Sequence, residues 1–98
     1  MFSGEVYEKL KLVPYGKVTT YKIIAESLGT KACRAVGNAL NRNEDPDTIP
    51  CFKVVKSDGT LGGFSRGEED KIRRLSEEGI EVVGGKIKDF EKKLYRFR

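Results

Sequence analysis

Residues 20–42 of the chain read as two short amphipathic helices with almost nothing between them, and this constrains the fold more than any other feature. Thr20 can cap the first helix, and Gly29 suits its C-terminal end. Thr30 follows at once and can cap a second helix, Lys31–Arg42. Two helices joined by so short a turn predict a helix-turn-helix.

The second of these helices separates into two different faces. One face carries small and apolar residues at helical spacing, as a stripe that packs against a core would: Ala32, Ala35, Val36, Ala39 and Leu40. The other face carries polar and basic residues and no acid: Lys31, Arg34, Asn38 and Asn41. An ordinary amphipathic helix explains the apolar stripe, but it does not require an outer face without carboxylates. We therefore expect one face to pack and the other to bind.

The positive charge of the chain lies in the same region. The formal net charge is +4, and residues 17–42 alone carry five bases against one acid, Glu26. A local positive field attracts phosphates, and the second helix of a helix-turn-helix commonly contacts DNA. The pattern therefore favours binding to nucleic acid, with a chance solvated face as the alternative.

A thiol stands at the start of an apolar run in the second half of the chain. Cys51 follows Pro50 directly, and residues 51–56 read as a strand that a turn at 57–59 folds back towards a return strand from Leu61. Residues 68–79 predict another helix and residues 82–87 a small hairpin. With a first helix around Val6, these elements predict a mainly α fold with a small β-hairpin.

Composition restricts the chemistry that the chain can carry out. The chain has two cysteines, Cys33 and Cys51, and no histidine, so we expect free thiols, no metal site and no cofactor. No apolar run is long enough for a membrane span, and the first residues lack the pattern of a secretory signal. We expect a soluble protein of the cytoplasm or nucleoid, without a membrane partner.

Several motifs, in order along the chain, carry a resemblance to a known family. The sequence resembles the DNA-binding, C-terminal domain of the O6-alkylguanine-DNA alkyltransferases from about residue 2 to Gly79. The matching segments are residues 13–21, residues 31–39, Asn43, Ile49-Pro50-Cys51, Val54-Val55, Ser57-Asp58-Gly59 and Gly62-Gly63-Phe64-Ser65. The resemblance implies a winged helix-turn-helix-like fold. It also implies one domain over residues 1–98, with a core at 2–79, a tail at 80–98 and without the family's N-terminal domain.

The resemblance implies a one-time, irreversible transfer of an alkyl group from guanine O6 to Cys51, after the damaged base has been rotated out of the duplex. Asn43 and Glu78 match the partners of the catalytic thiol. Arg34 matches the finger residue that fills the gap left in the base stack. The residues expected to bind DNA are Thr20, Tyr21, Lys31, Ala32, Arg34, Ala35, Gly37 and Asn38. The residues expected to form the lesion pocket are Tyr21, Leu40, Pro50, Cys51, Val54, Phe64 and Ser65.

The chain departs from the family next to the thiol. The family usually reads Pro-Cys-His-Arg-Val, whereas Phe52 and Lys53 follow Cys51 here, so the family's histidine is missing. Losing a positioned base typically lowers a rate by about 10² to 10⁴. The tail resembles that of the alkyltransferase-like proteins, which bind alkylated guanine and signal to excision repair without transferring anything, and which carry tryptophan at the acceptor position.

Three functions remain open at this stage. The first is an alkyl acceptor, a single-turnover methylated-DNA–protein-cysteine methyltransferase that acts as a monomer on double-stranded DNA containing O6-alkylguanine. The second is a damage sensor that binds the same lesion and recruits other repair proteins, with Cys51 serving only as a small apolar residue. The third is a winged-helix DNA binder unrelated to damage.

Overall fold

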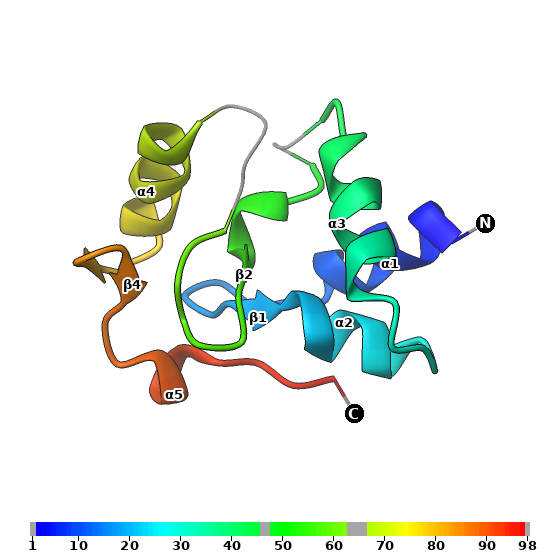
Figure 1. Cartoon of the computed structure of the whole chain (residues 1–98). Coiled ribbons are helices and arrows are strands. Elements are labelled where there is room, and N and C mark those ends of the chain that lie inside the picture. Colours follow the sequence, from blue (N-terminus) through cyan, green and yellow to red (C-terminus); the bar gives the residue numbers. More distant parts are fainter. Residues whose placement is uncertain (1, 46–47, 63–66, 98) are drawn as a thin grey trace.

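Three helices in the N-terminal half pack around one another and form one side of the molecule (Figure 1). They are α1 (Phe2–Lys11), α2 (Tyr21–Ser27) and α3 (Cys33–Asn41) in a computed structural model that describes residues 2–45, 48–62 and 67–97. The buried faces of these helices form a first core cluster with two residues from the middle of the chain. Its buried members are Val6, Leu10, Val13, Ile24, Ala25, Val36, Ala39, Leu40, Cys51 and Val54.

The helix-turn-helix predicted from the sequence is present, with a later start for its second helix. Thr20 caps α2 as expected, because its hydroxyl oxygen accepts a hydrogen bond from the Ile23 N–H at 3.0 Å. Thr30 does not cap α3, because its hydroxyl binds the Ala32 N–H at 3.2 Å and Ala32 itself stands at the N-cap position. The helix therefore begins at Cys33, and Lys31 and Ala32 belong to the turn.

The segment that carries the thiol is not the predicted six-residue strand. It forms a short 3-10 helix, η1 (Cys51–Lys53), followed by a two-residue strand, β2 (Val54–Val55). Strand β2 pairs in parallel with β1 (Thr19–Thr20), the strand that leads directly into α2. No strand forms at Leu61 and Gly62, the described residues of the expected return strand, and the turn before them closes through a hydrogen bond from Lys56 N–H to the Thr60 carbonyl at 2.9 Å.

Neighbouring residues of this thiol segment point into different cores. Cys51 and Val54 belong to the first cluster, whereas Phe52 and Val55 belong to a second. The second cluster joins the strand pair to the C-terminal half of the chain, and its buried members are Val18, Phe52, Val55, Leu61, Leu75, Ile80 and Ile87. The side chain at position 52 is therefore built into a packed apolar core on the side away from the three N-terminal helices.

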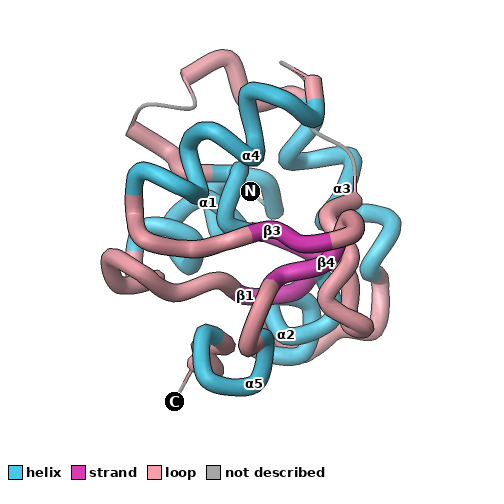
Figure 2. The backbone as a smooth tube through the Cα atoms, turned by 90° about the vertical axis from the view of Figure 1, so that its left-hand side faces the viewer, coloured by secondary structure: helices cyan, strands magenta, loops and turns pink. Residues whose placement is uncertain are grey.

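The C-terminal half covers the second core. Helix α4 (Glu68–Glu77) precedes an antiparallel hairpin of β3 (Val82–Val83) and β4 (Lys86–Ile87), and the last helix is α5 (Phe90–Lys93). Figure 2 shows the hairpin in the middle of this side, with α4 above it and α5 below it. These positions confirm the predicted helix and hairpin.

The tail returns to the N-terminal half and is part of the packed structure. Tyr95 N–H donates to the Val18 carbonyl at 2.7 Å, and Val18 N–H donates to the Lys93 carbonyl at 2.8 Å. The rings of Tyr95 and Phe97 meet edge to face, with centroids 5.2 Å apart, and both pack against the first core cluster. The aromatic residues of the tail thus help to cover the core.

The architecture confirms the fold class that the sequence predicts, a mainly α domain with a small β-hairpin and a helix-turn-helix. Within the described ranges, no helix is both long and apolar enough to cross a membrane.

Candidate functional site

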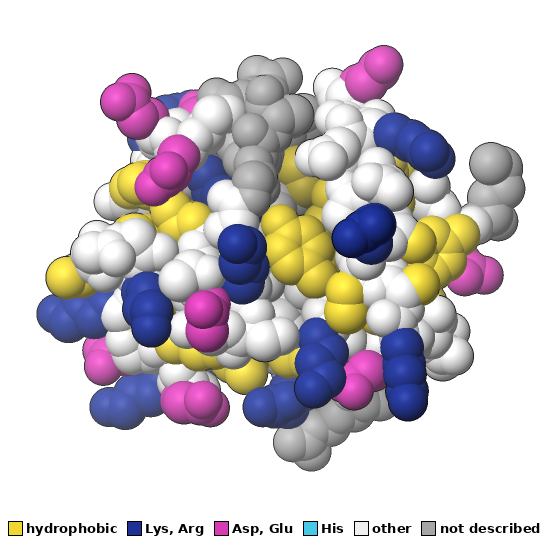
Figure 3. Space-filling model, viewed as in Figure 1, with side chains coloured by type: hydrophobic (Ala, Val, Ile, Leu, Met, Phe, Trp, Pro, Cys, Tyr) yellow, Lys and Arg dark blue, Asp and Glu magenta, His cyan; other side chains and the backbone are white. Residues whose placement is uncertain are grey.

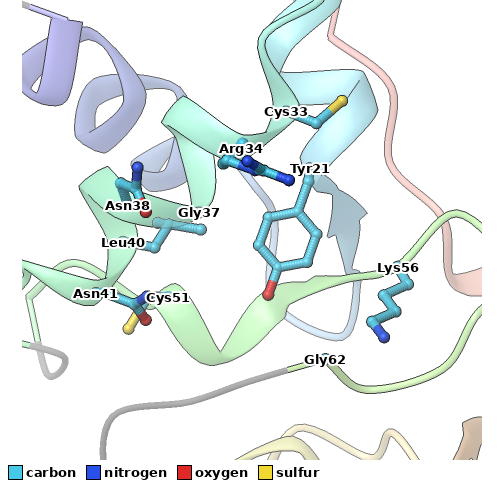
Figure 4. A pocket seen from close by; sticks show the side chains of 10 residues that line it. All are labelled: Tyr21, Cys33, Arg34, Gly37, Asn38, Leu40, Asn41, Cys51, Lys56 and Gly62. Atoms are coloured by element: carbon cyan, nitrogen blue, oxygen red, sulfur yellow. The ribbon is translucent and has the colours of Figure 1, made fainter.

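A pocket of about 390 Å³ opens between α3, the start of α2 and the thiol segment. Figure 4 shows Arg34 and Tyr21 extending into it from α3 and α2, with Cys51 towards one end and Lys56 near the backbone of Gly62 towards the other. The lining residues are Tyr21, Cys33, Arg34, Gly37, Asn38, Leu40, Asn41, Cys51, Lys56 and Gly62. None of these lining residues is an acid, so the described wall of the pocket carries only positive charges.

The parallel pairing of β1 with β2 explains how two distant parts of the sequence meet at this pocket. Because Thr20 of β1 is also the N-cap of α2, Tyr21 leaves the ladder as the first residue of the helix. On the other strand, η1 immediately precedes β2, so Cys51 enters from the neighbouring chain segment. The strand pair therefore sets the distance between the phenol and the thiol.

The Cys51 thiol is 5% exposed and lies among groups with opposing effects on its ionisation. Burial raises the pKa of the thiol above its ordinary value, as expected when a charge leaves water. A hydrogen bond from the Asn43 side chain and the positive charges of Lys71 and Arg74 act in the opposite direction. Burial also raises the pKa of the Tyr21 hydroxyl, with a further contribution from the nearby thiolate.

Asn43 is held in place by bonds to its own loop. Its side-chain nitrogen donates to the Ile49 carbonyl at 2.9 Å, and its side-chain oxygen accepts from the Asp45 N–H at 2.9 Å. The residue is 7% exposed. It therefore fixes the loop that delivers Pro50 and Cys51 as well as facing the sulfur.

Glu78 has a different partner from the one that the family resemblance implies. Its Oε1 lies 2.8 Å from Nζ of Lys53, and the same oxygen accepts the Gly16 N–H at 2.9 Å. Lys53 also donates to the Pro14 carbonyl at 3.1 Å. The carboxylate is thus committed to a buried ion pair, while Phe52, at the position of the family's histidine, packs in the second core.

The residues expected to bind DNA fall into exposed and buried groups. Lys31, Ala32, Arg34 and Asn38 are exposed, and Ala35, Gly37 and Tyr21 are half-buried. Thr20 is 3% exposed and acts as the cap of α2. Figure 3 shows hydrophobic side chains near the centre of this face with Lys and Arg side chains around them.

Of the residues expected to form the lesion pocket, the structure brings Tyr21, Leu40 and Cys51 together. Val54 is fully buried in the first core, and Pro50 is half-buried next to the thiol, but neither lines the pocket. Phe64 and Ser65 lie outside the described residues. Sequence reasoning did not identify Lys56 or Gly62 individually as lining residues. Lys56 directly follows the matched Val54-Val55, and Gly62 is the first residue of the matched Gly62-Gly63-Phe64-Ser65, and these positions are the signal that could have found them.

Gly62 and Tyr21 are fitted to each other. A Cβ atom at position 62 would lie 2.9 Å from the Tyr21 hydroxyl oxygen, and the backbone there has φ +72°. Both observations favour glycine, because a side chain would be strained and would displace the phenol.

The chain is similar in sequence to known DNA-repair proteins. Residues 1–80 match the family model described as 6-O-methylguanine DNA methyltransferase, DNA binding domain. A bifunctional methyltransferase/endonuclease of Picrophilus torridus is 50% identical over 93 residues, which are 94% of this chain and 30% of that protein. A methylated-DNA–protein-cysteine methyltransferase of Saccharolobus solfataricus is 44% identical over 81 residues, which are 83% of this chain and 52% of that protein. The matched region thus covers only about 30% of the first relative and about half of the second.

Solved structures show the same fold. The structure of S. pombe Atl1 in complex with damaged DNA containing O6-carboxymethylguanine aligns with a TM-score of 0.86 and 32% identity, over 98% of this chain and 95% of that one. The O6-methylguanine-DNA methyltransferase of Pyrococcus kodakaraensis aligns with a TM-score of 0.75 and 45% identity, over 81% of this chain and 46% of that one.

Proposed function

Because the chain belongs to the family of the 6-O-methylguanine DNA methyltransferase DNA-binding domain, we propose that it binds DNA damaged at guanine O6 and accepts the alkyl group on Cys51. In this proposal α3 enters the minor groove of the DNA, and the pocket between Tyr21 and Cys51 receives the extruded base. The observation that carries the proposal is that Cys51 lines the same cavity as Tyr21 and Arg34 of the helix-turn-helix.

The helix-turn-helix supports the binding step through size and charge. The B-DNA minor groove is about 6 Å wide, narrower than a helix with large side chains. The exposed or half-buried Ala32, Ala35 and Gly37 keep the approaching surface thin, while Arg34 is exposed and points into the pocket. Arg34 fills the space left in the base stack, and the loss of stacking costs a few kcal/mol that contacts in the pocket must offset.

The transfer itself needs one bond exchange and one proton. The sulfur of Cys51 forms a bond to the alkyl carbon while the bond between that carbon and guanine O6 breaks. The thiol proton is released to solvent, and the departing guanine takes up one proton on its ring through the hydroxyl of Tyr21 on the pocket wall, which regains a proton from solvent. The product is a thioether on Cys51 and an unmodified guanine, and one chain acts once.

A damage sensor is the second candidate, and the site itself favours it in one respect. Burial raises the pKa of the acceptor thiol, and no imidazole is present to remove its proton. The match to Atl1 also extends over nearly the whole of both chains, tail included. In the sensor, the same pocket holds the lesion and the chain recruits other repair proteins. The names of the bifunctional relatives make an endonuclease the first class of partner to test.

A mass measurement separates the two candidates. The chain is incubated with a duplex that contains one O6-methylguanine, digested, and the peptide that contains Cys51 is weighed. A gain of one methylene on that peptide supports the acceptor, whereas tight binding with unchanged mass supports the sensor. The peptide of the half-buried Cys33 is the internal control for non-specific methylation.

Two variants test the assignment of roles. Cys51→Ala should bind the lesion without any change in mass. Arg34→Ala should bind the lesion more weakly. Its melting temperature should stay unchanged, because the exposed Arg34 side chain forms no hydrogen bond or ion pair with other described residues. Equal affinity of Arg34→Ala and the wild type for O6-methylguanine DNA would refute the role of Arg34 in holding the lesion.

A further inference from the structure

One lysine is completely buried next to the thiol segment. Lys71 of α4 is 0% exposed, although lysine is almost never fully buried in proteins without a partner. Its ammonium group donates to the Val54 carbonyl at 2.7 Å and to the Leu61 carbonyl at 2.6 Å. A buried charge is tolerated when hydrogen bonds replace its water shell, so these carbonyls hold the lysine in place.

The two carbonyls belong to the segments on either side of the pocket. Val54 closes η1, because its N–H donates back to the Cys51 carbonyl. Leu61 directly precedes Gly62, where an added Cβ atom would meet the Tyr21 hydroxyl. One ammonium group therefore joins the segment that presents the sulfur to the segment that faces the phenol.

Lys71 also interacts with the sulfur electrostatically. The charged and polar groups that face Cys51 are Tyr21 from α2, Asn43 from the loop after α3, and Lys71 and Arg74 from α4. Lys71 itself is influenced by Cys51 and by Glu68 of its own helix. Burial lowers the pKa of Lys71 to about 8, and the thiolate and Glu68 act against that fall. The ammonium and the thiolate therefore stabilise each other.

We propose that Lys71 is a positioning residue for the acceptor thiol: it fixes the two carbonyls beside the pocket and stabilises the Cys51 thiolate. In this role Lys71 does not contact the lesion, and its side chain stays in the same position during the transfer. The meaning of this inference for repair rests on the proposed function, but the inference concerns the thiol of the free protein and can be tested without DNA.

The test is the pH dependence of alkylation of Cys51 by iodoacetamide, a reaction in which the thiolate forms a bond to carbon and iodide leaves. The rate is followed by the mass of the Cys51 peptide, with the Cys33 peptide as the reference in the same sample. An opposite charge that interacts with a thiolate can shift its pKa by about one unit or more, so Lys71→Met should react about tenfold more slowly below pH 8. Lys71→Arg keeps the charge and should lie closer to the wild type.

A purely structural role for Lys71 gives a different result. In that case Lys71→Met lowers the melting temperature while the pH midpoint of Cys51 alkylation stays where it is, and this outcome overturns the inference. A lower rate for Cys33 in the same variant would show a general change in reactivity, so the Cys51 rate is read relative to Cys33.

A second measurement on the wild-type chain avoids the folding of any variant. The titration of Lys71 is followed by NMR of side-chain-labelled lysine before and after Cys51 is capped with iodoacetamide. If the ammonium and thiolate stabilise each other, capping removes the anion and lowers the midpoint of Lys71 below about 8. An unchanged midpoint would contradict the inference.

These outcomes are independent of the proposed function. If the Cys51 midpoint shifts in Lys71→Met but no methyl group is taken from O6-methylguanine DNA, the acceptor function fails and the role of Lys71 stands. If methyl transfer occurs and the pH midpoint of Cys51 alkylation does not shift in Lys71→Met, the acceptor function stands and the proposed role of Lys71 fails.

Discussion

Removing one partner of the buried ion pair between Lys53 and Glu78 should cost more stability than removing one partner of an exposed pair such as Lys88 and Glu81. The side chains of Lys53 and Glu78 are only 5% and 14% exposed, and Nζ lies 2.8 Å from Oε1. The pair joins η1 to the C-terminal end of α4 and, through the Gly16 N–H and the Pro14 carbonyl, to the turn after α1. Replacing Lys53 with methionine keeps most of the apolar stem and removes the charge.

The loss of unfolding free energy in Lys53→Met depends on the Glu78 carboxylate that remains without its partner. Breaking a buried pair from one side costs about 3–5 kcal/mol, because the remaining charge loses its partner and stays out of water. Glu78 keeps the Gly16 N–H and is not completely buried, so we expect the lower end, about 3 kcal/mol, for Lys53→Met. For a domain of this size, each kcal/mol corresponds to about 4–8 °C, and the melting temperature should fall by about 12–24 °C.

Urea unfolding followed by circular dichroism measures this change, and the chain provides a matched control. Lys88 lies 3.5 Å from Glu81 with side chains 56% and 68% exposed, so Lys88→Met should cost less than about 1 kcal/mol. The double variant Lys53→Met/Glu78→Leu removes both charges and should regain much of the loss. A cost for Lys53→Met that is no larger than that for Lys88→Met would refute the reasoning.

Three further predictions follow from single contacts. Thr20→Ala removes the hydroxyl that accepts the Ile23 N–H and should lower the unfolding free energy by about 1 kcal/mol in urea titrations, and an unchanged value would contradict its role as a cap. Gly62→Ala forces a Cβ against the Tyr21 hydroxyl and should weaken binding of O6-methylguanine DNA in a gel-shift assay more than binding of undamaged DNA, whereas an equal loss on both would argue against a role in the pocket. Folded Lys71 loses its proton near pH 8, before the unfolded chain does, so the unfolded state binds more protons and the contribution of Lys71 to stability should rise from pH 8 to about pH 10.5. Urea titrations of the wild type and Lys71→Met across that range measure it, and a pH-independent difference would contradict the lowered pKa.

The sequence predicted those elements whose signals are local. The apolar spacing of Val6 and Leu10 placed α1, and the Thr20 cap placed α2. The start of α3 was predicted two residues too early, because Thr30 has the right side chain for a cap but uses it within the turn, on Ala32. A capping residue identifies a helix start only if the backbone that follows is free to turn.

The thiol segment could not be predicted in the same way because its structure depends on a distant partner. Val54 and Val55 favour a strand, but only two residues of β1 are available to pair with them, so the strand ends there and η1 forms before it. The parallel register between residues 19 and 54 leaves no local trace in the sequence.

The burial of the charged residues near the site could not be predicted for a related reason. Lysine and glutamate are normally assigned to the surface, yet Lys53 and Lys71 are 4% and 0% exposed. Among their partners are backbone carbonyls and, for Lys53, the carboxylate of Glu78, which the fold brings together. The family resemblance indicated that Glu78 has a partner in the site, but that this partner is Lys53 became visible only in three dimensions.

The same pairing changes what a restored histidine can do. From the sequence alone, Phe52→His should speed transfer, because it returns the family's residue next to the thiol. In the structure, Phe52 is 7% exposed in the second core while Cys51 faces the first, and Glu78 is bound to Lys53. An imidazole at that position would be surrounded by apolar side chains without a carboxylate to orient it. We therefore expect Phe52→His to lose about 2 kcal/mol of stability, as a buried polar group without a partner does, and to transfer no faster than the wild type.

Combining Phe52→His with Lys53→Met releases Glu78 to hold the imidazole, and this double variant should react faster than Phe52→His when the alkylation of Cys51 is timed by peptide mass. Acceleration by Phe52→His alone would show that the second core does not fix the direction of this side chain and would contradict this prediction.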